Sequence, residues 1–420
     1  MTDFIPINVQ SFLPATKLNW LYFDINSYFA TIEQQVDPSL RYKPVVVVPL
    51  ISDSTCAIAA SHEAKLKGIK TGTKIYEAKR LCPELICVQA KHELYVTYHH
   101  KILDEINKYL YVDHVFSIDE GAAKLTGDQC EESNALKIAL QIKQGIRTNV
   151  GEYITCSLGI APNRFLAKIA TNMKKPDGLI VIKPEDIPQK LFFLRLKDIP
   201  GVGKGVLQRL DEYGIDSVEK LYKQDARSLK TIWGSITGEK CWYLLRGADL
   251  PIIESKKSTI GHSQVIAPNL RNVTSSREIA LMLLLRAATR LRTTKLNASS
   301  VELNIVTTDT AIFKSRLKIT PSSDSNTLSK ALLSCWSKLI EENKIKGVKK
   351  ISINLNGLKP ESQQLTFNDF QANNTKQKRQ KVSDSLDRLN KKYNKNIISL
   401  GLLPKGNRKQ NVVAFGYIPE

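Results

Sequence analysis

Long apolar runs are missing from this sequence. No uncharged hydrophobic stretch reaches the ~18 residues that a membrane-spanning helix needs. The first ten residues, MTDFIPINVQ, have neither the charged start nor the apolar centre of a signal peptide. We therefore expect a cytoplasmic protein without a membrane partner.

Paired cysteines are missing as well. The seven cysteines include no CxxC pair, and Cys82 and Cys87 have no histidine-rich partner segment. This usage favours buried thiols in a reducing compartment, with neither disulfides nor zinc. A P-loop is also excluded, because PGVGKG (200–205) lacks the G-x4-G-K-[ST] spacing.

Acidic residues are scarce relative to basic ones. The 61 Lys and Arg exceed the 41 Asp and Glu, which gives a net charge of +20. Such a surplus is typical of proteins that bind a polyanion, either nucleic acid or an anionic membrane surface. Between residues 371 and 410, eleven basic residues stand against two aspartates. This composition favours a flexible basic arm.

The 420 residues are enough for about two to four domains. Strand-like and helix-like patterns alternate up to residue 183, with strands at 20–23, 43–50, 115–118 and 155–161 and long helices at 91–110 and 134–150. Short helices without strand signal follow at 184–250. A linker at 251–257 precedes a second module of long helices and strands at 258–360. The pattern predicts a multidomain α+β protein.

Three acids occur where apolar, strand-like runs end: Asp24 after WLYF, and Asp119 and Glu120 after VFSI. Taken singly, each acid is explained by a turn or a helix cap. If the two runs are neighbouring strands, however, three carboxylates converge and need hard cations to stay ionised. A pair of Mg²⁺ ions fits best, since two such ions can clamp an in-line phosphoryl transfer.

The segment IPGVGKG (199–205) joins two predicted helices in the manner of a helix-hairpin-helix turn. Gly201 and Gly203 allow close approach, and Lys204 begins a helix whose backbone N–H groups can face a phosphate. Such contacts hold the DNA backbone without identifying bases. The alternative is a glycine-rich helix connection that binds nothing.

Five motifs, in this order, resemble the Y-family (translesion) DNA polymerases: YFDINSYFATIEQ, CAIAASHEAKLKGIKTG, FSIDEG, CSLGIAPNRFLAKIATNMKKPDG and IPGVGKG. The resemblance runs from about residue 19 to about residue 357. DRLNKKYNKNIISLG and AFGYIP near the end resemble the bacterial UmuC-like branch more weakly. The resemblance implies a right-hand polymerase with palm (1–27 and 94–183), fingers (28–93), all-α thumb (184–250), linker (251–257), little finger (258–360) and basic tail (361–420).

The resemblance also implies a reaction and a site. Template-directed addition of dNTPs to a primer–template DNA would use two Mg²⁺ ions, with Mn²⁺ as a substitute. The metal ligands would be Asp24, Asp119, Glu120 and the backbone carbonyl of Ile25. Phe29 falls at the steric gate that excludes a ribose 2′-hydroxyl, although a core aromatic would fit the same place. The residues expected at the nucleotide are His62, Lys65 and Lys175.

This chain departs from the family pattern at several positions. His62 and Lys65 stand where many relatives have Tyr and Arg, so bidentate phosphate contacts are lost there. Asn26 replaces a frequent Asp, and Gly121–Ala122 replaces Ala-Tyr. These departures bear on nucleotide handling and on local packing rather than on the class of reaction.

Accessory partners are suggested by the end of the chain. In SQQLTFNDF (362–370), Gln364, Leu365 and Phe367 loosely match a sliding-clamp peptide, while packing onto the little finger explains them equally well. A UmuD-like subunit is a second candidate partner. Two other functions remain open: a non-catalytic DNA-binding scaffold, and another palm-fold enzyme such as a nucleotidyl cyclase.

Overall fold

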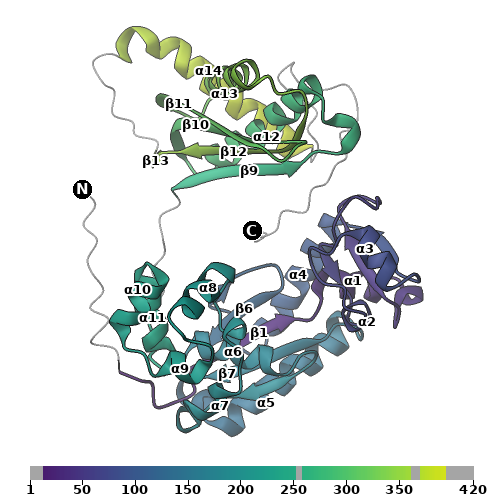
Figure 1. Cartoon of the computed structure of the whole chain (residues 1–420), viewed down its shortest axis with the longest axis vertical. Coiled ribbons are helices and arrows are strands. Elements are labelled where there is room, and N and C mark those ends of the chain that lie inside the picture. The colour runs from purple at the N-terminus through teal and green to yellow at the C-terminus, as the bar shows by residue number, and fades with distance from the viewer. Residues whose placement is uncertain (1–12, 252–257, 361–368, 394–420) are drawn as a thin grey trace. The chain divides into compact units, whose positions relative to one another are not determined.

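The computed structural model describes residues 13–251, 258–360 and 369–393 of the chain. The chain divides into two compact units, with the boundary at residue 252 (Figure 1). None of the helices in these ranges is both long and apolar enough to cross a membrane.

A five-stranded sheet organises the first unit. Its order is β5-β6-β1-β7-β8, so β1 is central and runs antiparallel to β6 and β7, while β7 and β8 are parallel. The bounds are Trp20–Ile25 (β1), His114–Val115 (β5), Glu120–Lys124 (β6), Cys156–Ala161 (β7) and Leu179–Val181 (β8). Every residue of β1 is buried except Asp24, which is half-buried.

Helices cover both faces of this sheet. They are α4 (His92–Asn107), α5 (Glu132–Gly145), continued by a π-helical turn (Ile146–Val150), and α6 (Arg164–Met173). The long helices predicted at 91–110 and 134–150 are thereby confirmed.

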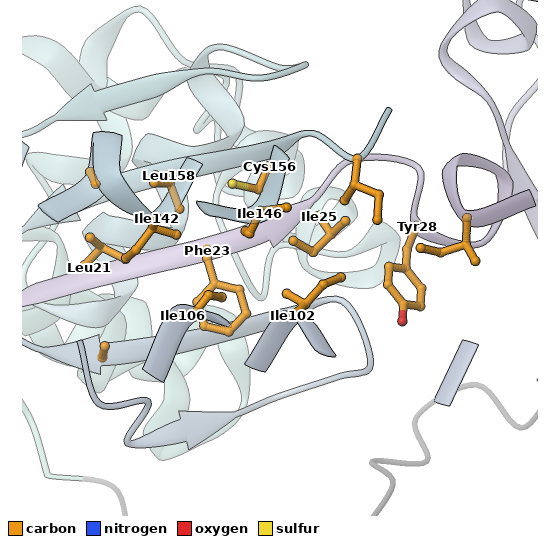
Figure 2. Packing of buried hydrophobic residues seen from close by; sticks show 14 of the residues in the cluster. Leu21, Phe23, Ile25, Tyr28, Ile102, Ile106, Ile142, Ile146, Cys156 and Leu158 are labelled. Atoms are coloured by element: carbon orange, nitrogen blue, oxygen red, sulfur yellow. The ribbon is translucent and has the colours of Figure 1, made fainter. Parts of the chain in front are cut away.

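Alternate residues of β1 face opposite sides of the sheet. Leu21, Phe23 and Ile25 pack against isoleucines of α4 and α5 (Figure 2). Trp20 and Tyr22 belong to a second core together with α6. Burial of each such side chain contributes roughly 1.5–3 kcal/mol. Asp24, two positions after Tyr22, therefore belongs to the face that α6 covers.

A smaller sheet is inserted between α1 (Tyr28–Val36) and α4. Its order is β3-β2-β4, so the apolar run at 45–48 is central, as its composition predicts. The other bounds are Pro38–Leu40 (3-10 turn), Val45–Val48 (β2), Ala59–Ala60 (β3), His62–Leu66 (α2), Ile75–Leu81 (α3) and Ile86–Gln89 (β4).

The strand predicted for VFSI is wrong in its extent. β5 ends at Val115, and the chain then turns, because the backbone N–H groups of Phe116 and Ser117 donate to the carbonyl of Glu120 at 3.0 and 3.2 Å. Asp119 therefore lies in a hairpin turn, and Glu120 is the first residue of β6.

Short helices make up the rest of the first unit, as expected. Their bounds are Gly127–Cys130 (3-10, before α5), Pro184–Asp186 (3-10), Gln189–Phe192 (α7), Leu196–Asp198 (3-10), Lys204–Glu212 (α8), Val218–Tyr222 (α9), Ala226–Trp233 (α10) and Ile236–Leu245 (α11). No strand occurs between residues 184 and 250, all of which are described.

The second unit packs two long helices on one face of an antiparallel sheet of order β11-β10-β12-β9, with β13 paired to one end of β10 (Figure 1). Lys314, Arg316 and Lys318 alternate with residues that pack toward this core, so they lie on the open face of β11. The bounds are Thr259–Val265 (β9), Pro268–Leu270 (3-10), Val273–Thr293 (α12), Leu296–Thr307 (β10), Ile312–Ser322 (β11), Ser325–Asn343 (α13), Val348–Asn356 (β12) and Lys359–Pro360 (β13).

The flexible arm predicted for residues 371–410 is wrong for its first part, because α14 (Asp369–Lys392) is a helix that packs against α13. The Asp387 carboxylate accepts from the Arg292 guanidinium at 2.6 and 3.0 Å. Ser383, 4% exposed, accepts from the backbone N–H of Ser325 at the start of α13. An ion pair and a hydrogen bond to the rest of the second unit therefore hold α14 in place. Composition alone does not reveal these contacts. Residues 394–410 lie outside the described ranges.

Replacing Asp387 by Ala should loosen α14. The Arg292 side chain is only 8% exposed, so its charge would lose its carboxylate in a poorly hydrated place, at a cost of about 1–3 kcal/mol. We expect faster amide exchange across 381–390 and a lower melting temperature for the second unit. Arg388→Ala, at a neighbouring exposed position, is the matched control. Unchanged exchange in Asp387→Ala would show that this ion pair does not hold the helix.

Candidate active site

The three acids meet at the end of β1. Asp24 and Glu120 are directly opposite each other in the antiparallel register of β1 and β6. The backbone N–H of Ile25 donates to the carbonyl of Asp119 at 2.8 Å, which ties the third acid to the same strand end. The sheet thus brings together residues that are about a hundred positions apart in the sequence, because directly opposite residues have Cα atoms ~4.5–5.5 Å apart.

Each acid has a different partner. Lys175 Nζ lies 2.6 Å from an Asp24 oxygen, and Lys168 Nζ donates to both oxygens of Glu120 at 3.0 and 2.9 Å. The Ser117 hydroxyl donates to Asp119. Among the residues described here, no three acidic, histidine or cysteine side chains are gathered so that they could hold a metal ion as they stand. The ammonium groups of Lys168 and Lys175 place positive charge at two of these acids.

The electrostatics follow from this crowding. Burial raises the pKa of Asp119, and the charges of Asp24 and Glu120 add to the effect, while the Ser117 hydroxyl opposes it. Burial and the charge of Glu120 also raise the pKa of Tyr22. The site therefore disfavours further negative charge and suits a cation, and its oxygen donors are those that Mg²⁺ prefers.

A cleft of about 500 Å³ opens beside the acids. This volume lies within the usual range of small-molecule sites, ~300–1,000 Å³. Seven residues predicted for the site line the cleft: Asp24, Ile25, Phe29, His62, Lys65, Asp119 and Lys175. Glu120 and Lys168 do not line the cleft. The Glu120 carboxylate therefore lies at the edge of the site.

The turn from β1 into α1 brings Phe29 to the cleft. Ser27, in a left-handed conformation (φ 51°), starts α1 only two residues after β1 ends. Phe29 is 8% exposed, and its ring centre lies 4.7 Å from that of Tyr95. Phe29 is therefore both a core residue and a wall of the cleft, and Tyr95 behind it leaves the ring little room to retreat.

His62 and Lys65 lie on α2, on the other side of the cleft. Lys65 Nζ donates to the Ser27 hydroxyl at 2.7 Å. Burial lowers the pKa of Lys65, and the neighbouring charge of Lys175 lowers it further. Two ammonium groups that face one cleft disfavour each other and favour an anion between them.

Asn26 has a role that the sequence did not suggest. Its side-chain oxygen accepts from the backbone N–H of Asp177 at 2.8 Å, and its amide donates to Ser157 at 3.0 Å. Lys143 Nζ donates to the Asp177 carboxylate at 2.6 Å. These contacts fix the loop that carries Lys175 against the sheet. The sequence offered two signals for Asn26: its position beside Asp24 and its departure from the frequent Asp of the family.

The departure at Gly121–Ala122 has a packing reason. A Cβ atom on Gly121 would lie 2.5 Å from the ring of Phe23, its cross-strand partner. On the other face Ala122 is opposite Tyr22, whose ring stacks on that of Phe116 with centres 5.6 Å apart. Aromatic rings thus fill the space that larger side chains would need.

The glycine turn lies away from the cleft, before α8. Gly201 has φ +85°, and Gly203 is the residue before the helix starts. No atom would meet a Cβ placed on either glycine within 4 Å, and Lys204 is exposed. The turn therefore presents accessible backbone. Gln364, Leu365 and Phe367 lie outside the described residues.

Family models match most of the chain from residue 23 to residue 367. Residues 23–172 match the impB/mucB/samB family, and residues 257–367 match the C-terminal domain of that family. Residues 197–249 match a model described as "DNA polymerase-iota, thumb domain".

Curated relatives carry the name DNA polymerase IV. The one from Moorella thermoacetica is 34% identical over 270 residues, which are 63% of this chain and 66% of the relative. The one from Oceanobacillus iheyensis is 27% identical over 390 residues, 90% of each chain. Matches to Bacillus relatives span about half of their length. The predicted nearness to the UmuC-like branch stays a prediction.

Solved structures share the fold. A chimera of the Y-family DNA polymerases Dbh and Dpo4 has a TM-score of 0.71 and 24% identity, over 82% of this chain and all of the other. A structure described as an insertion ternary complex of Dbh DNA polymerase has a TM-score of 0.55 and 25% identity, over the same shares.

Motifs, fold and relatives agree. The chain belongs to the Y-family DNA polymerases of the DinB/UmuC superfamily, which are DNA-directed DNA polymerases with a multidomain α+β, right-hand fold.

Proposed function

We propose that this protein extends a primer on a DNA template by two-metal phosphoryl transfer, with low processivity and with tolerance of damaged template. The observation that carries the proposal is the convergence of Asp24, Asp119 and Glu120 on one sheet end beside a nucleotide-sized cleft. The 90% coverage of a relative named DNA polymerase IV supports the same activity.

The three carboxylates and the carbonyl of Ile25 would hold two Mg²⁺ ions, or Mn²⁺ in their place. When bound, the ions would lower the pKa of the primer 3′-hydroxyl and balance the charge on the triphosphate. Lys175 and Lys168 already place positive charge at these oxygens. Asp24 and Glu120, opposite each other on paired strands, would hold the ions between the primer end and the α-phosphate.

The remaining cleft residues would hold the nucleotide. Lys175 and Lys65 supply point charges for the phosphates, and His62 supplies a ring N–H. Phe29, backed by Tyr95, would occupy the space that a ribose 2′-hydroxyl needs. A rigid ring at that place is enough to select dNTPs.

DNA contacts would come from other parts of the chain. The accessible backbone at Gly201 and Gly203, with Lys204, suits duplex phosphates. The basic open face of β11 adds a salt-sensitive, sequence-independent contact. On this proposal, the domains keep the boundaries predicted from the sequence: palm 1–27 and 94–183, fingers 28–93, thumb 184–250, linker 251–257, little finger 258–360 and tail 361–420.

The alternative functions are not favoured. A nucleotidyl cyclase has no use for a helix-hairpin-helix turn, and a non-catalytic scaffold has no need of three converging acids. The cytoplasmic location predicted from cysteine usage stays a prediction.

Removing two acids should abolish synthesis. In a primer-extension assay with Mg²⁺ and dNTPs, we expect the Asp119→Ala/Glu120→Ala variant to lose about a hundredfold or more, because the lost ligands stabilise charge in the reaction itself. Asp128→Ala, at an exposed position of the same domain, should extend normally. Equal extension by the double variant would contradict the metal assignment. Failure of the wild type over a range of salt would favour the scaffold.

Shortening Phe29 should weaken sugar selection. We expect Phe29→Ala to raise rNTP incorporation relative to dNTP by about ten- to a hundredfold, since a missing steric wall is worth a few kcal/mol. Phe29→Tyr keeps the ring and should keep the preference for dNTPs. Competition between matched rNTP and dNTP on one template measures the ratio. Unchanged selectivity in Phe29→Ala would make this ring only structural.

A sliding clamp and a UmuD-like subunit remain proposed partners. If Gln364, Leu365 and Phe367 bind a clamp, alanine at all three positions should abolish stimulation of extension by the cognate clamp and leave unstimulated extension intact. Stimulation retained in full would remove the clamp peptide from the proposal.

A further inference from the structure

Lys168 contacts one of the three acids, although the family motifs assign it no role. Its Nζ donates to both oxygens of Glu120, so the ammonium engages the whole carboxylate. The Lys168 side chain is 34% exposed and that of Glu120 is 19% exposed. The pair is therefore partly shielded from solvent, and neither charge is fully hydrated.

Close packing of the backbone keeps Lys168 near Glu120. Lys168 lies on α6, which packs so closely on β7 that a Cβ on Gly159 would lie 2.1 Å from the carbonyl of Ala167. The Lys168 ammonium also lies 5.4 Å from the centre of the Tyr22 ring, at the side of the sheet where Asp24 lies. The pair therefore separates by rotation of the two side chains rather than by movement of the helix away from the sheet.

The three acids thus differ in what a metal ion must displace. Asp119 is held by the neutral hydroxyl of Ser117. Asp24 is paired with Lys175, which lines the nucleotide cleft, so an incoming triphosphate can attract that ammonium away. Lys168 is absent from the cleft lining, so a nucleotide there offers it no such exchange.

We propose that Lys168 is a positioning residue that competes with a divalent ion for Glu120. In the enzyme without DNA it keeps Glu120 folded onto α6 and weakens binding of the ion that uses this carboxylate. When no metal is bound, the lysine reduces the repulsion between the carboxylates of Asp24 and Glu120. A higher metal concentration is then needed to fill the metal site. This inference rests on the proposed two-metal function.

The test measures Mn²⁺ binding to the full chain without DNA or nucleotide, by electron paramagnetic resonance of the free ion. We expect Lys168→Met to bind Mn²⁺ at a midpoint concentration about three- to tenfold lower than the wild type, as breaking one partly exposed ion pair predicts. Lys168→Arg keeps the charge and should behave as the wild type. Lys124→Met removes a lysine on β6 for which the structure shows no contact with these acids; its midpoint should not move.

A second background separates competition from a general loss of positive charge. In Glu120→Gln, Lys168→Met should leave the Mn²⁺ midpoint unchanged, because the carboxylate for which lysine and ion compete is gone. The same shift in both backgrounds, or no shift in either, would overturn the proposal.

Thermal unfolding gives an independent readout. In EDTA, Lys168→Met should melt below the wild type, since Glu120 then faces Asp24 without its ammonium. Saturating Mn²⁺ should raise its melting temperature more than that of the wild type. An equal rise in both proteins would mean that the lysine only supports the fold, and would overturn the competition.

The Mn²⁺-binding measurements distinguish failure of the Lys168 inference from failure of the proposed two-metal function. Mn²⁺ binding that Asp24→Asn abolishes, with no effect of Lys168→Met, leaves the two-metal site standing and removes Lys168 from it. Absence of such binding in both the wild type and Lys168→Met would count against both.

Discussion

Like charges placed opposite each other on paired strands destabilise a sheet, and the pairing of Asp24 with Glu120 is such a case. The fold compensates with two ammonium groups from one stretch of chain, Lys168 on α6 and Lys175 just after it. Most other features of the site serve to keep this stretch close. Gly159 lets α6 approach the sheet, and Asn26 holds the loop that follows. The acids and their counter-charges therefore form one structural unit.

The opposite face of β1 shows why this arrangement can be tolerated. Leu21, Phe23 and Ile25 are buried against α4 and α5 in one apolar cluster (Figure 2). At roughly 1.5–3 kcal/mol per buried side chain, that face stabilises the strand by more than the few kcal/mol that crowded carboxylates cost. The position of the acids is thus set by apolar packing on the far side of the strand, and the charges themselves contribute little to the choice of register.

The sequence was informative wherever a single segment carried the signal. The apolar run at 45–48 predicted a central strand, and the periodicities at 91–110 and 134–150 predicted long helices. It failed where the outcome depended on distant partners. VFSI is an exception, because it has the composition of a strand and a local turn, closed by the Glu120 carbonyl, ends the strand early. The C-terminal segment looks disordered by composition, yet Asp387 finds Arg292 some 95 positions away. The roles of Lys168 and Asn26 were missed because their partners become visible only in the folded sheet.

The charges around the cleft also bear on the replacements at His62 and Lys65. Lys65 donates to Ser27, and its pKa is lowered by burial and by the charge of Lys175, so the cleft holds two ammonium groups that repel each other. In the proposed function, a bound triphosphate would offset the repulsion between these two ammonium groups and attract Lys175 away from Asp24. The carboxylate released in this way is the one expected to bind metal. Nucleotide and ion would then favour each other's binding through an exchange of partners at Lys175, as linkage requires of two ligands that share one rearrangement. A lysine at position 65 can take part because it needs no fixed bidentate geometry.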